Sequence, residues 1–187
     1  MKTSTLRALA ISAILGVSSF SVSAYADNPM VGGAPMLATK NIIENAVNSK
    51  DHTTLVAAVK AAGLVETLEG AGPFTVLAPT NEAFAALPAG TVDNLLKPEN
   101  KAMLVKILTC HVIAAKAMAA DIMSMSKADG GTHVVTTVGG CKLWLKADGG
   151  KVTITDESGG VANVTIADVV QSNGVIHVID KVLLPKM

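Results

Sequence analysis

The sequence is poor in aromatic residues and almost free of arginine. Phe, Tyr and Trp make up 3% of the 187 residues, there is a single Trp, and Arg7 is the only arginine. Beyond Arg7 the chain therefore offers none of the bidentate forks that recognise phosphate groups and guanine. The formal net charge is zero, so the long-range attraction that supports nucleic-acid binding is also missing. These absences argue against a nucleic-acid-binding protein.

The sequence contains enough small apolar residues to build a hydrophobic core. Half of the residues are hydrophobic and only 16% are charged, and Ala and Val replace the missing aromatics. This composition is typical of a compact, ordered domain rather than a disordered chain. The length suits one ordinary domain and is too short for two comfortable ones.

The first 26 residues have the features of a secretory signal peptide. Lys2 and Arg7 form a positive start, residues 9–17 are apolar, and Ala24 and Ala26 place small residues at the two positions that a signal peptidase reads. The apolar run is too short to span a membrane, and no second one follows. We predict cleavage after Ala26, a secreted protein that is periplasmic or extracellular, and no membrane span after cleavage.

The only two cysteines are Cys110 and Cys141. Export would place them in an oxidising compartment, where a disulfide is permitted. Closing a loop of this length would stabilise the fold by about 3–4 kcal/mol on the chain-entropy model. Two free buried thiols are the alternative, and the sequence leaves both open because it does not give the distance between the two Cα atoms.

The first half of the exported chain carries mainly helical patterns. Residues 27–37 contain Pro, Gly and Met without periodicity and predict a flexible N-terminal arm. Asn41, followed by Glu44, fits the capping box of a first helix. Further helices are predicted over residues 53–62 and 64–70, and from Thr91 and from Pro98 onward.

From Cys110 onward the pattern changes to short β-type runs separated by Gly-rich turns. These runs are residues 110–114, 132–138, 141–147, 151–155 and 161–166. The final run, from Val175, is apolar on both faces and predicts a central strand covered on both sides, with His177 and Asp180 in or near a core. Helices early and antiparallel-type strands late indicate the α+β class.

The segment "GPFTVLAPTNEAFAALP", residues 72–88, predicts a strand, a sharp turn and a helix. Phe74, Val76 and Ala78 alternate with other residues, as a strand with one mostly buried face would. Proline at the next position ends the strand because it has no N–H to donate. Thr80 or Asn81 then caps the helix. The glycines precede a strand rather than a helix, so a phosphate-binding loop is not indicated.

Two separated segments resemble the signature segments of the fasciclin domain. They are "FTVLAPTNEAFAALP" (residues 74–88) and "NGVIHVIDKVLLP" (residues 173–185), with "LTCHVI" between them. The resemblance covers roughly residues 38–185 and implies a single fasciclin-like domain over residues 38–187. The implied fold is a wedge-shaped antiparallel β-sandwich flanked by several N-terminal helices. The implied function is an exported, non-enzymatic binding domain that mediates adhesion through a cell-surface or extracellular-matrix protein or a polysaccharide.

The resemblance also suggests contact residues. Adhesive animal members carry a Tyr-His pair after the long helix, and the matching pair here is Cys110-His111, in which the tyrosine is lost. A core position is therefore the favoured interpretation of His111. The same members carry an Asp-Ile pair before the second signature, which corresponds to Asp168-Val169. Asp168 is a candidate partner contact, and a role as a turn residue that accepts backbone N–H bonds is the alternative.

Metal binding and catalysis have weaker support. The four histidines (52, 111, 133 and 177) are well separated and lack the paired spacing of a zinc site. Met118, Met123 and Met125, with the two cysteines, suggest an alternative function as a periplasmic copper-handling or redox protein. Methionines that fill gaps in a core are more common. We therefore predict no cofactor and no resident metal.

No catalytic constellation is recognisable either. His177 and Asp180 are three residues apart on a predicted strand, so they point to opposite faces and cannot form an acid–base pair. The sequence therefore predicts that both belong to a structural motif, as do Thr80 and Asn81. The sequon at Asn163 is relevant only in a eukaryotic secretory pathway.

Overall fold

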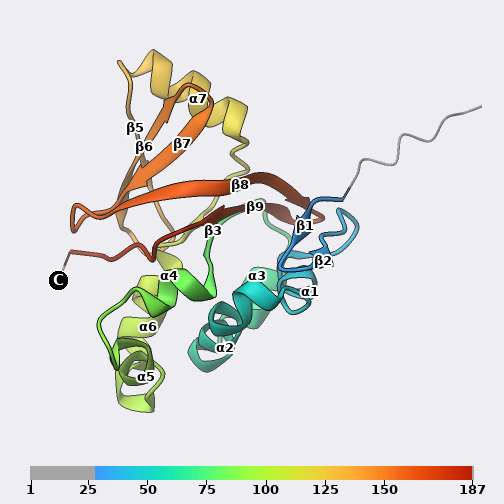
Figure 1. Ribbon diagram of the computed structural model, residues 1–187, viewed down its shortest axis with the longest axis vertical. Helices are drawn as coiled ribbons and strands as arrows, with labels where there is room; N and C mark the ends of the chain where they lie inside the picture. Colours follow the sequence, from blue (N-terminus) through green and yellow to red (C-terminus); the bar gives the residue numbers. More distant parts are fainter. Residues whose placement is uncertain (1–27, 187) are drawn as a thin grey trace, which may run out of the picture.

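The computed structural model describes residues 28–186, which form one curved sheet with helices on both sides of it (Figure 1). The seven strands of the sheet lie in the order β4-β3-β9-β8-β7-β6-β5. Their bounds are β3 (Phe74–Pro79), β4 (Val112–Ile113), β5 (His133–Thr136), β6 (Lys142–Asp148), β7 (Lys151–Thr155), β8 (Val161–Gln171) and β9 (Gly174–Ile179).

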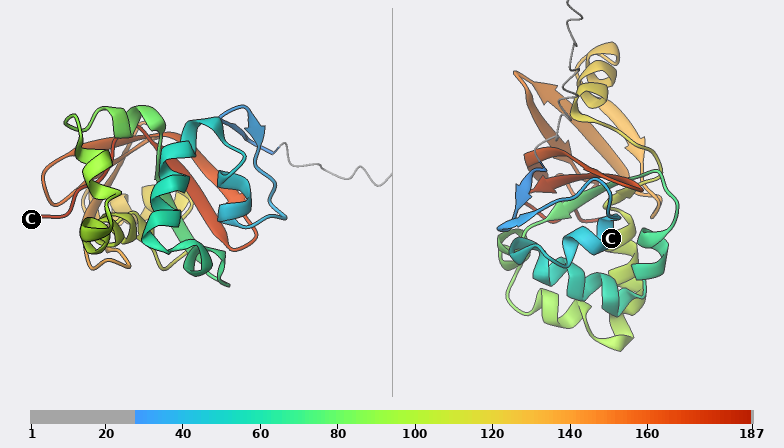
Figure 2. Two further views of the ribbon diagram at one scale, coloured as in Figure 1. Left: turned by 90° about the horizontal axis from the view of Figure 1, so that it is seen from below. Right: turned by 90° about the vertical axis from the view of Figure 1, so that its right-hand side faces the viewer.

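The long strand β8 joins two halves of the sheet that face each other. Its first residues pair with β7, and the remainder pairs with β9. The register shifts between Val164 and Ile166 and again between Ile166 and Val169, and bulges of this kind bend a strand and increase its twist. Figure 2 shows the resulting wedge. The predicted α+β class and wedge-shaped sandwich are confirmed, except that β3 and β9 pair in parallel.

Most of the helices cover one side of the β3–β9 half of the sheet (Figure 1). They are α1 (Ile42–Ala46), α2 (Thr53–Ala62), α3 (Val65–Glu69), α4 (Asn81–Ala85), α5 (Thr91–Leu95) and α6 (Lys101–Thr109), with short 3₁₀ turns η1 (Lys50–His52) and η2 (Pro98–Asn100). The last helix, α7 (Ala119–Ala128), packs instead against β5 and β6. The helices predicted from the sequence are confirmed, and α7 is an addition to them.

The capping box predicted at the start of α1 is confirmed. The Asn41 side chain accepts a hydrogen bond from the backbone N–H of Glu44, and the Glu44 carboxylate accepts one from the backbone N–H of Asn41, both at 2.8 Å. These two bonds satisfy donors that a helix start leaves unpaired. They fix the point at which the chain enters the helical layer.

Two hydrophobic cores lie on opposite sides of β3 and β9. The helical core lies between the helices and this pair of strands, and includes Ile42, Leu55, Val59, Phe84, Ile107 and Ile176. The sheet core lies between the two halves of the sheet and α7, and includes Leu77, Ile122, Leu145, Val152, Ile154 and Ile179.

The two strands that separate these cores are buried on both faces. For β9 this confirms the prediction of a central, covered strand. For β3 the prediction of one mostly buried face is wrong, because Thr75 and Leu77 are buried as well as Val76 and Ala78. Val76 and Ala78 face the helices and Leu77 faces the other half of the sheet, while the Thr75 hydroxyl donates a hydrogen bond to the carbonyl of Ala115.

A short hairpin begins the folded part of the chain. Strands β1 (Met30–Val31) and β2 (Ala34–Pro35) pair antiparallel, and Val31 and Met36 are buried in the helical core. Gly32 has a φ of 58°, and a Cβ there would lie 2.7 Å from the backbone N of Lys50. Residues 30–36 therefore belong to the folded domain, where the sequence pattern predicted a flexible arm.

The predicted signal peptide and its cleavage site after Ala26 lie outside residues 28–186. Within that range, none of the helices combines the length and the apolar character needed to cross a membrane. At the other end of the chain, β9 stops at Ile179, and the rest of the final apolar run has no regular structure. Val182 and Leu183 are nevertheless buried, one in each core.

Candidate functional site

Cys110 and Cys141 form a disulfide in the structure. Cys110 follows the last residue of α6, and Cys141 precedes β6. Their Cα atoms are 5.3 Å apart, within the usual range for a disulfide. Both residues are buried. Of the two alternatives left open by the sequence, the structure therefore contains the disulfide. The chain between the two cysteines includes β4, α7 and β5.

The neighbouring His111 is a buried hydrogen-bonding residue. Its Nδ1 donates to the carbonyl of Ile107 at 2.8 Å, and its Nε2 accepts from the backbone N–H of Leu183 at 2.9 Å. Burial lowers the pKa of His111 to about 4, although the Ile107 carbonyl and the nearby Asp156 carboxylate act in the opposite direction. The neutral ring thus ties α6 to the C-terminal segment, as the core interpretation predicted. At 2% exposure it is not available to a partner.

Asp168 is held at the junction of β8 and α7. Its carboxylate accepts a hydrogen bond from the backbone N–H of Ala119 at 2.7 Å. Its own N–H donates to Nδ1 of His177 at 3.2 Å, and Nε2 of that ring donates to the carbonyl of Ala117 at 2.8 Å. Asp168 has a φ of 59°, a conformation that Asp tolerates better than most residues. This geometry matches the alternative role of Asp168 as an acceptor of backbone N–H bonds.

The other half of the suggested contact pair, Val169, is 0% exposed and packs in the helical core. The structure therefore does not support a contact role for the side chains of Val169 and His111. Burial removes both side chains from the surface. The Asp168 carboxylate is half-buried and remains the member of the suggested set that reaches solvent.

Asp180 forms hydrogen bonds to Asn163 in the adjacent strand β8 and none to His177. Its two carboxylate oxygens accept from the backbone N–H and the side-chain amide of Asn163, each at 2.7 Å. Asp180 is exposed and His177 is buried, and no hydrogen bond joins them within the described residues. The prediction that both residues lie in or near a core is therefore confirmed for His177 and wrong for Asp180, which lies beyond the end of β9.

Thr80 and Asn81 each cap a helix, but not the same one. The Thr80 hydroxyl accepts from the backbone N–H of Ala83 in α4. The Asn81 carbonyl oxygen accepts from the backbone N–H of Thr54 at 3.0 Å, and its amide donates to the carbonyl of Lys50 at 2.8 Å. Asn81 therefore caps α2, which lies far upstream in the sequence.

Sequence reasoning missed a buried carboxylate, Asp156. One oxygen accepts from Ser158 and from the backbone N–H of Gly160, and the other accepts from the backbone N–H of Leu184 at 2.8 Å. Asp followed by Ser and two glycines is a signal for a side-chain-stabilised turn, so the turn was recognisable. The bond to Leu184 was not, because it joins segments distant in the sequence.

A second missed residue is Asn173, at the turn between β8 and β9. Its side-chain oxygen accepts from the backbone N–H of Ile42, and its amide donates to the carbonyls of Leu68 and Gly70. One side chain thereby joins the start of α1 and the end of α3 to the turn between the two strands. The second signature segment begins at Asn173, and these hydrogen bonds explain why an asparagine stands at that position.

Two of the three methionines of the copper alternative point in different directions. Met123 and Met125 are two positions apart on α7, which places them about 200° apart around the helix. Met125 lines a shallow hollow with His133, whereas Met123 is exposed. The cysteines are bonded to each other, and within residues 28–186 no group of three or more His, Cys, Asp or Glu side chains could hold a metal. The disulfide removes the free cysteines on which the alternative rested, and nothing in the described residues supports it.

A row of four paired residues crosses the sheet on the side facing away from the sheet core. Val134 pairs with Trp144, Trp144 with Thr155, and Thr155 with Val161. The intervening residues, such as Leu145, point into the sheet core. Val134 and Val161 are about half exposed and Trp144 is partly exposed. We call these four residues the outer sheet face.

The comparisons with known proteins identify the family. Residues 50–185 match the fasciclin domain. The chain belongs to the fasciclin family. Protein sll1483 of Synechocystis sp. is 53% identical over 146 residues, which cover 78% of this chain and 74% of that protein. The uncharacterized protein sll1735 of the same organism is 41% identical over 147 residues, covering 77% and 97%.

Fasciclin domains also occur in longer relatives. Transforming growth factor-beta-induced protein ig-h3 of Sus scrofa is 40% identical over 131 residues, which cover 70% of this chain but 17% of that protein. Among solved structures, a FAS1 domain pair from the insect cell adhesion molecule Fasciclin I superposes with a TM-score of 0.70 at 18% identity, covering 78% of this chain and 51% of that chain. The likeness to that structure shows the fasciclin fold.

Proposed function

We propose that this fasciclin protein is exported and binds a partner at the cell surface or in the extracellular matrix, where it mediates adhesion. The match of residues 50–185 to the fasciclin domain carries the proposal. A fold shared with an insect cell adhesion molecule supports it. The signal-peptide pattern of residues 1–26 supports export to the periplasm or the extracellular space.

The protein acts by binding and not by catalysis in this proposal. His111, His177 and Asp156 would be natural acid–base groups, yet each is occupied by hydrogen bonds that hold the backbone. A nucleophile would need a base within hydrogen-bond reach and a third group to orient that base. The polar residues of the two signature segments are better explained as parts of the fold.

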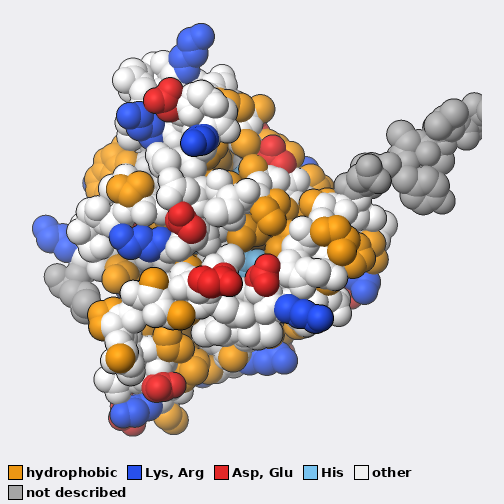
Figure 3. Space-filling model, viewed as in Figure 1, with side chains coloured by type: hydrophobic (Ala, Val, Ile, Leu, Met, Phe, Trp, Pro, Cys, Tyr) orange, Lys and Arg blue, Asp and Glu red, His pale blue; other side chains and the backbone are white. Residues whose placement is uncertain are grey.

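Charge gives little guidance to the partner. Figure 3 shows Lys and acidic side chains interspersed across the face seen there, and the sequence has no net charge. Partner recognition would therefore depend on shape and on local apolar and hydrogen-bonding contacts. A surface protein or a polysaccharide fits this requirement, whereas a nucleic acid does not.

The outer sheet face is the surface that we assign to the partner. Trp144 lies in the middle of the row, between Val134 and Thr155. Tryptophan is enriched among the residues that dominate binding energy, because one side chain buries a large rigid area and offers an N–H donor. Asp168 is the second candidate contact, because its carboxylate is only half-buried.

The test is an attachment assay with the exported protein immobilised on a surface. We expect saturable retention of cells or matrix material, competition by the soluble protein, and at least tenfold weaker retention with Trp144→Ala. Val47→Ala is the control for loss of an exposed apolar side chain elsewhere, because Val47 is about as exposed as Val134 and Val161 but lies on the helical side. Retention that is lost with Asp168→Asn but kept with Trp144→Ala would move the contact to Asp168. Absence of any retention would contradict the proposed function.

A further inference from the structure

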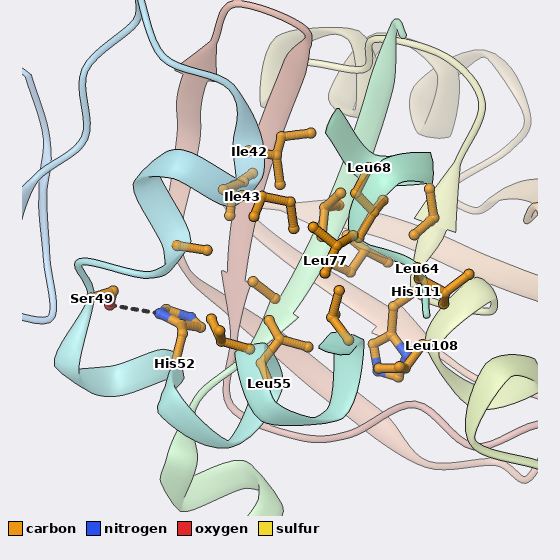
Figure 4. Close-up of a pocket in the computed structure, with 18 of the residues that line it drawn as sticks. Ile42, Ile43, Ser49, His52, Leu55, Leu64, Leu68, Leu77, Leu108 and His111 are labelled. Atoms are coloured by element: carbon orange, nitrogen blue, oxygen red, sulfur yellow. Dashed lines mark hydrogen bonds between the residues drawn. The ribbon is translucent and has the colours of Figure 1, made fainter. Parts of the chain in front are cut away.

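The helical core encloses an apolar cavity between α1, α2, α3 and strands β3 and β9 (Figure 4). Its free volume is about 50 Å³. A single water-sized group needs roughly 10–15 Å³ of such volume, so the cavity has room for a few heavy atoms. The lining is almost wholly aliphatic and includes Ile43, Leu55, Val59, Leu68, Leu108 and Ile176.

Two buried histidines contribute to this lining, and they differ in one respect. His111 has hydrogen-bond partners for both ring nitrogens. His52 has a partner only for Nδ1, which lies 2.8 Å from the hydroxyl of Ser49. Its Nε2 is buried and has no hydrogen-bond partner in the part of the chain that the structure describes. No other buried side-chain nitrogen or oxygen among the described residues lacks one. In Figure 4 the two rings lie on opposite sides of the apolar lining.

The bond to Ser49 indicates which nitrogen of His52 carries the hydrogen. The Ser49 hydroxyl forms this one side-chain hydrogen bond within residues 28–186, so its hydrogen is satisfied only if Nδ1 is the acceptor. A neutral ring that accepts at Nδ1 carries its hydrogen at Nε2. The Ala78 carbonyl lies near the ring of His52, but it does not meet the geometry of a hydrogen bond to Nε2. Burial is the main cause that lowers the pKa of His52, and this carbonyl, Asp51 and Glu82 offset part of this effect. The unpartnered atom is therefore a neutral N–H donor.

We propose that this cavity binds a small neutral molecule with an apolar body of a few heavy atoms and one accepting oxygen, which accepts a hydrogen bond from Nε2 of His52. Alcohols, ketones and small esters share this chemistry. A carboxylate is excluded because the lining offers a neutral donor, and an unpaired anion is costly to bury. A buried donor without an acceptor destabilises the empty state, and the ligand would remove that cost. The site is separate from the outer sheet face.

The experiment is a titration of the whole exported protein with 2-butanone, followed by NMR of the histidine ring nitrogens. We expect a saturable shift at Nε2 of His52 and none at either nitrogen of His111. His52→Leu should weaken 2-butanone binding at least tenfold while retaining xenon, an apolar probe without an acceptor. His52→Gln, whose amide can donate from a similar position, should restore part of the ketone affinity.

Other outcomes would overturn the proposal. Equal affinity of the native protein and His52→Leu for 2-butanone would mean that apolar contact alone holds the ligand. A non-saturable shift, or an ordered water that stays on Nε2 at saturating ketone, would mean that no organic ligand uses this donor. As a second variant, Val56→Met should fill the cavity from its half-buried position and abolish both ketone and xenon binding; retained binding would place the ligand elsewhere.

Discussion

The two cores of the molecule differ in how completely they are filled. In the sheet core, Leu145, Ile154 and Ile179 are each 0% exposed, and the Cys110–Cys141 disulfide fastens one edge of the surrounding structure. The helical core contains a cavity of about 50 Å³ and a buried nitrogen without a partner. The helical core therefore has space for a ligand, and we infer that the sheet core is the more closely packed of the two.

The difference follows from the elements that form each core. Two facing halves of a twisted sheet interdigitate residue by residue, which favours dense packing. The helical side is assembled largely from very short helices: α1, α3, α4 and α5 have five residues each. Short helices meet through loops and caps rather than through long ridges, and this leaves gaps between their side chains. We infer that the helical side is the more adaptable part of the domain.

The largest expected effect is a truncation in the sheet core. Leu145→Ala should lower the free energy of unfolding by roughly 4 kcal/mol, because its surroundings cannot collapse into the space left behind. Leu55→Ala, beside the existing cavity, should cost less, roughly 2–3 kcal/mol, because this region is already loosely filled. Urea unfolding of the two variants checks the comparison. Equal losses, or a larger loss for Leu55→Ala, would show that the two cores are packed alike.

Removal of the disulfide should have an effect of similar size. The two cysteines are separated by 31 positions, and opening a loop of that length costs about 3–4 kcal/mol on the chain-entropy model. The double variant Cys110→Ala/Cys141→Ala should therefore unfold at clearly lower urea concentration. The native protein in reductant provides the control, since it removes the bond without changing the packing. Unchanged stability in both would mean that the bridge does not constrain the unfolded chain.

Acid should destabilise the protein through its buried histidines. The pKa of His111 is about 4 in the folded state, against 6.5 for an unperturbed histidine, so the unfolded chain binds the proton more readily. The contribution of the neutral His111 ring to the free energy of unfolding is fully present above pH 6.5. It is lost as the pH falls towards 4, and the loss is on the order of 3 kcal/mol. The lowered pKa of His52 acts in the same direction. Urea midpoints from pH 7 to 4.5 test this. A midpoint that does not change with pH would contradict a neutral, buried His111.

The smallest expected effect is the loss of a helix cap. Thr80→Ala removes the acceptor for the backbone N–H of Ala83 and should cost about 1 kcal/mol. Thermal unfolding measures the loss, and attachment should be unaffected once the protein is folded. Thr80→Ser is the matched control, because it keeps the hydroxyl. Unchanged melting together with lost partner binding would make this turn a contact site.

The sequence predicted the fold well where the signals are local. Asn41 with Glu44, Thr80 before α4, and the covered strand that contains His177 are all decided by neighbours within a few positions, or by the pattern of one run. The hairpin around Gly32 escaped notice because strands of two residues have no measurable periodicity.

The remaining features depend on contacts between distant segments. The cap that Asn81 provides for α2, the bond from Asp156 to Leu184, and the parallel pairing of β3 with β9 exist only after the chain has folded. The cavity beside His52 arises from the way distant segments pack, and the pattern of residues along the sequence does not predict it. The suggested contacts failed at Val169 because a resemblance transfers residue types and not exposure.

The proposed adhesive function is tested most directly by the attachment assay with soluble competitor. The exported protein is immobilised, and retained cells or matrix material are measured against increasing soluble protein, with Trp144→Ala and Val47→Ala as competitors in parallel. We predict that the native protein and Val47→Ala compete equally, while Trp144→Ala requires at least tenfold higher concentration. Retention that no soluble form can compete, or no retention above a surface without the protein, would contradict the account.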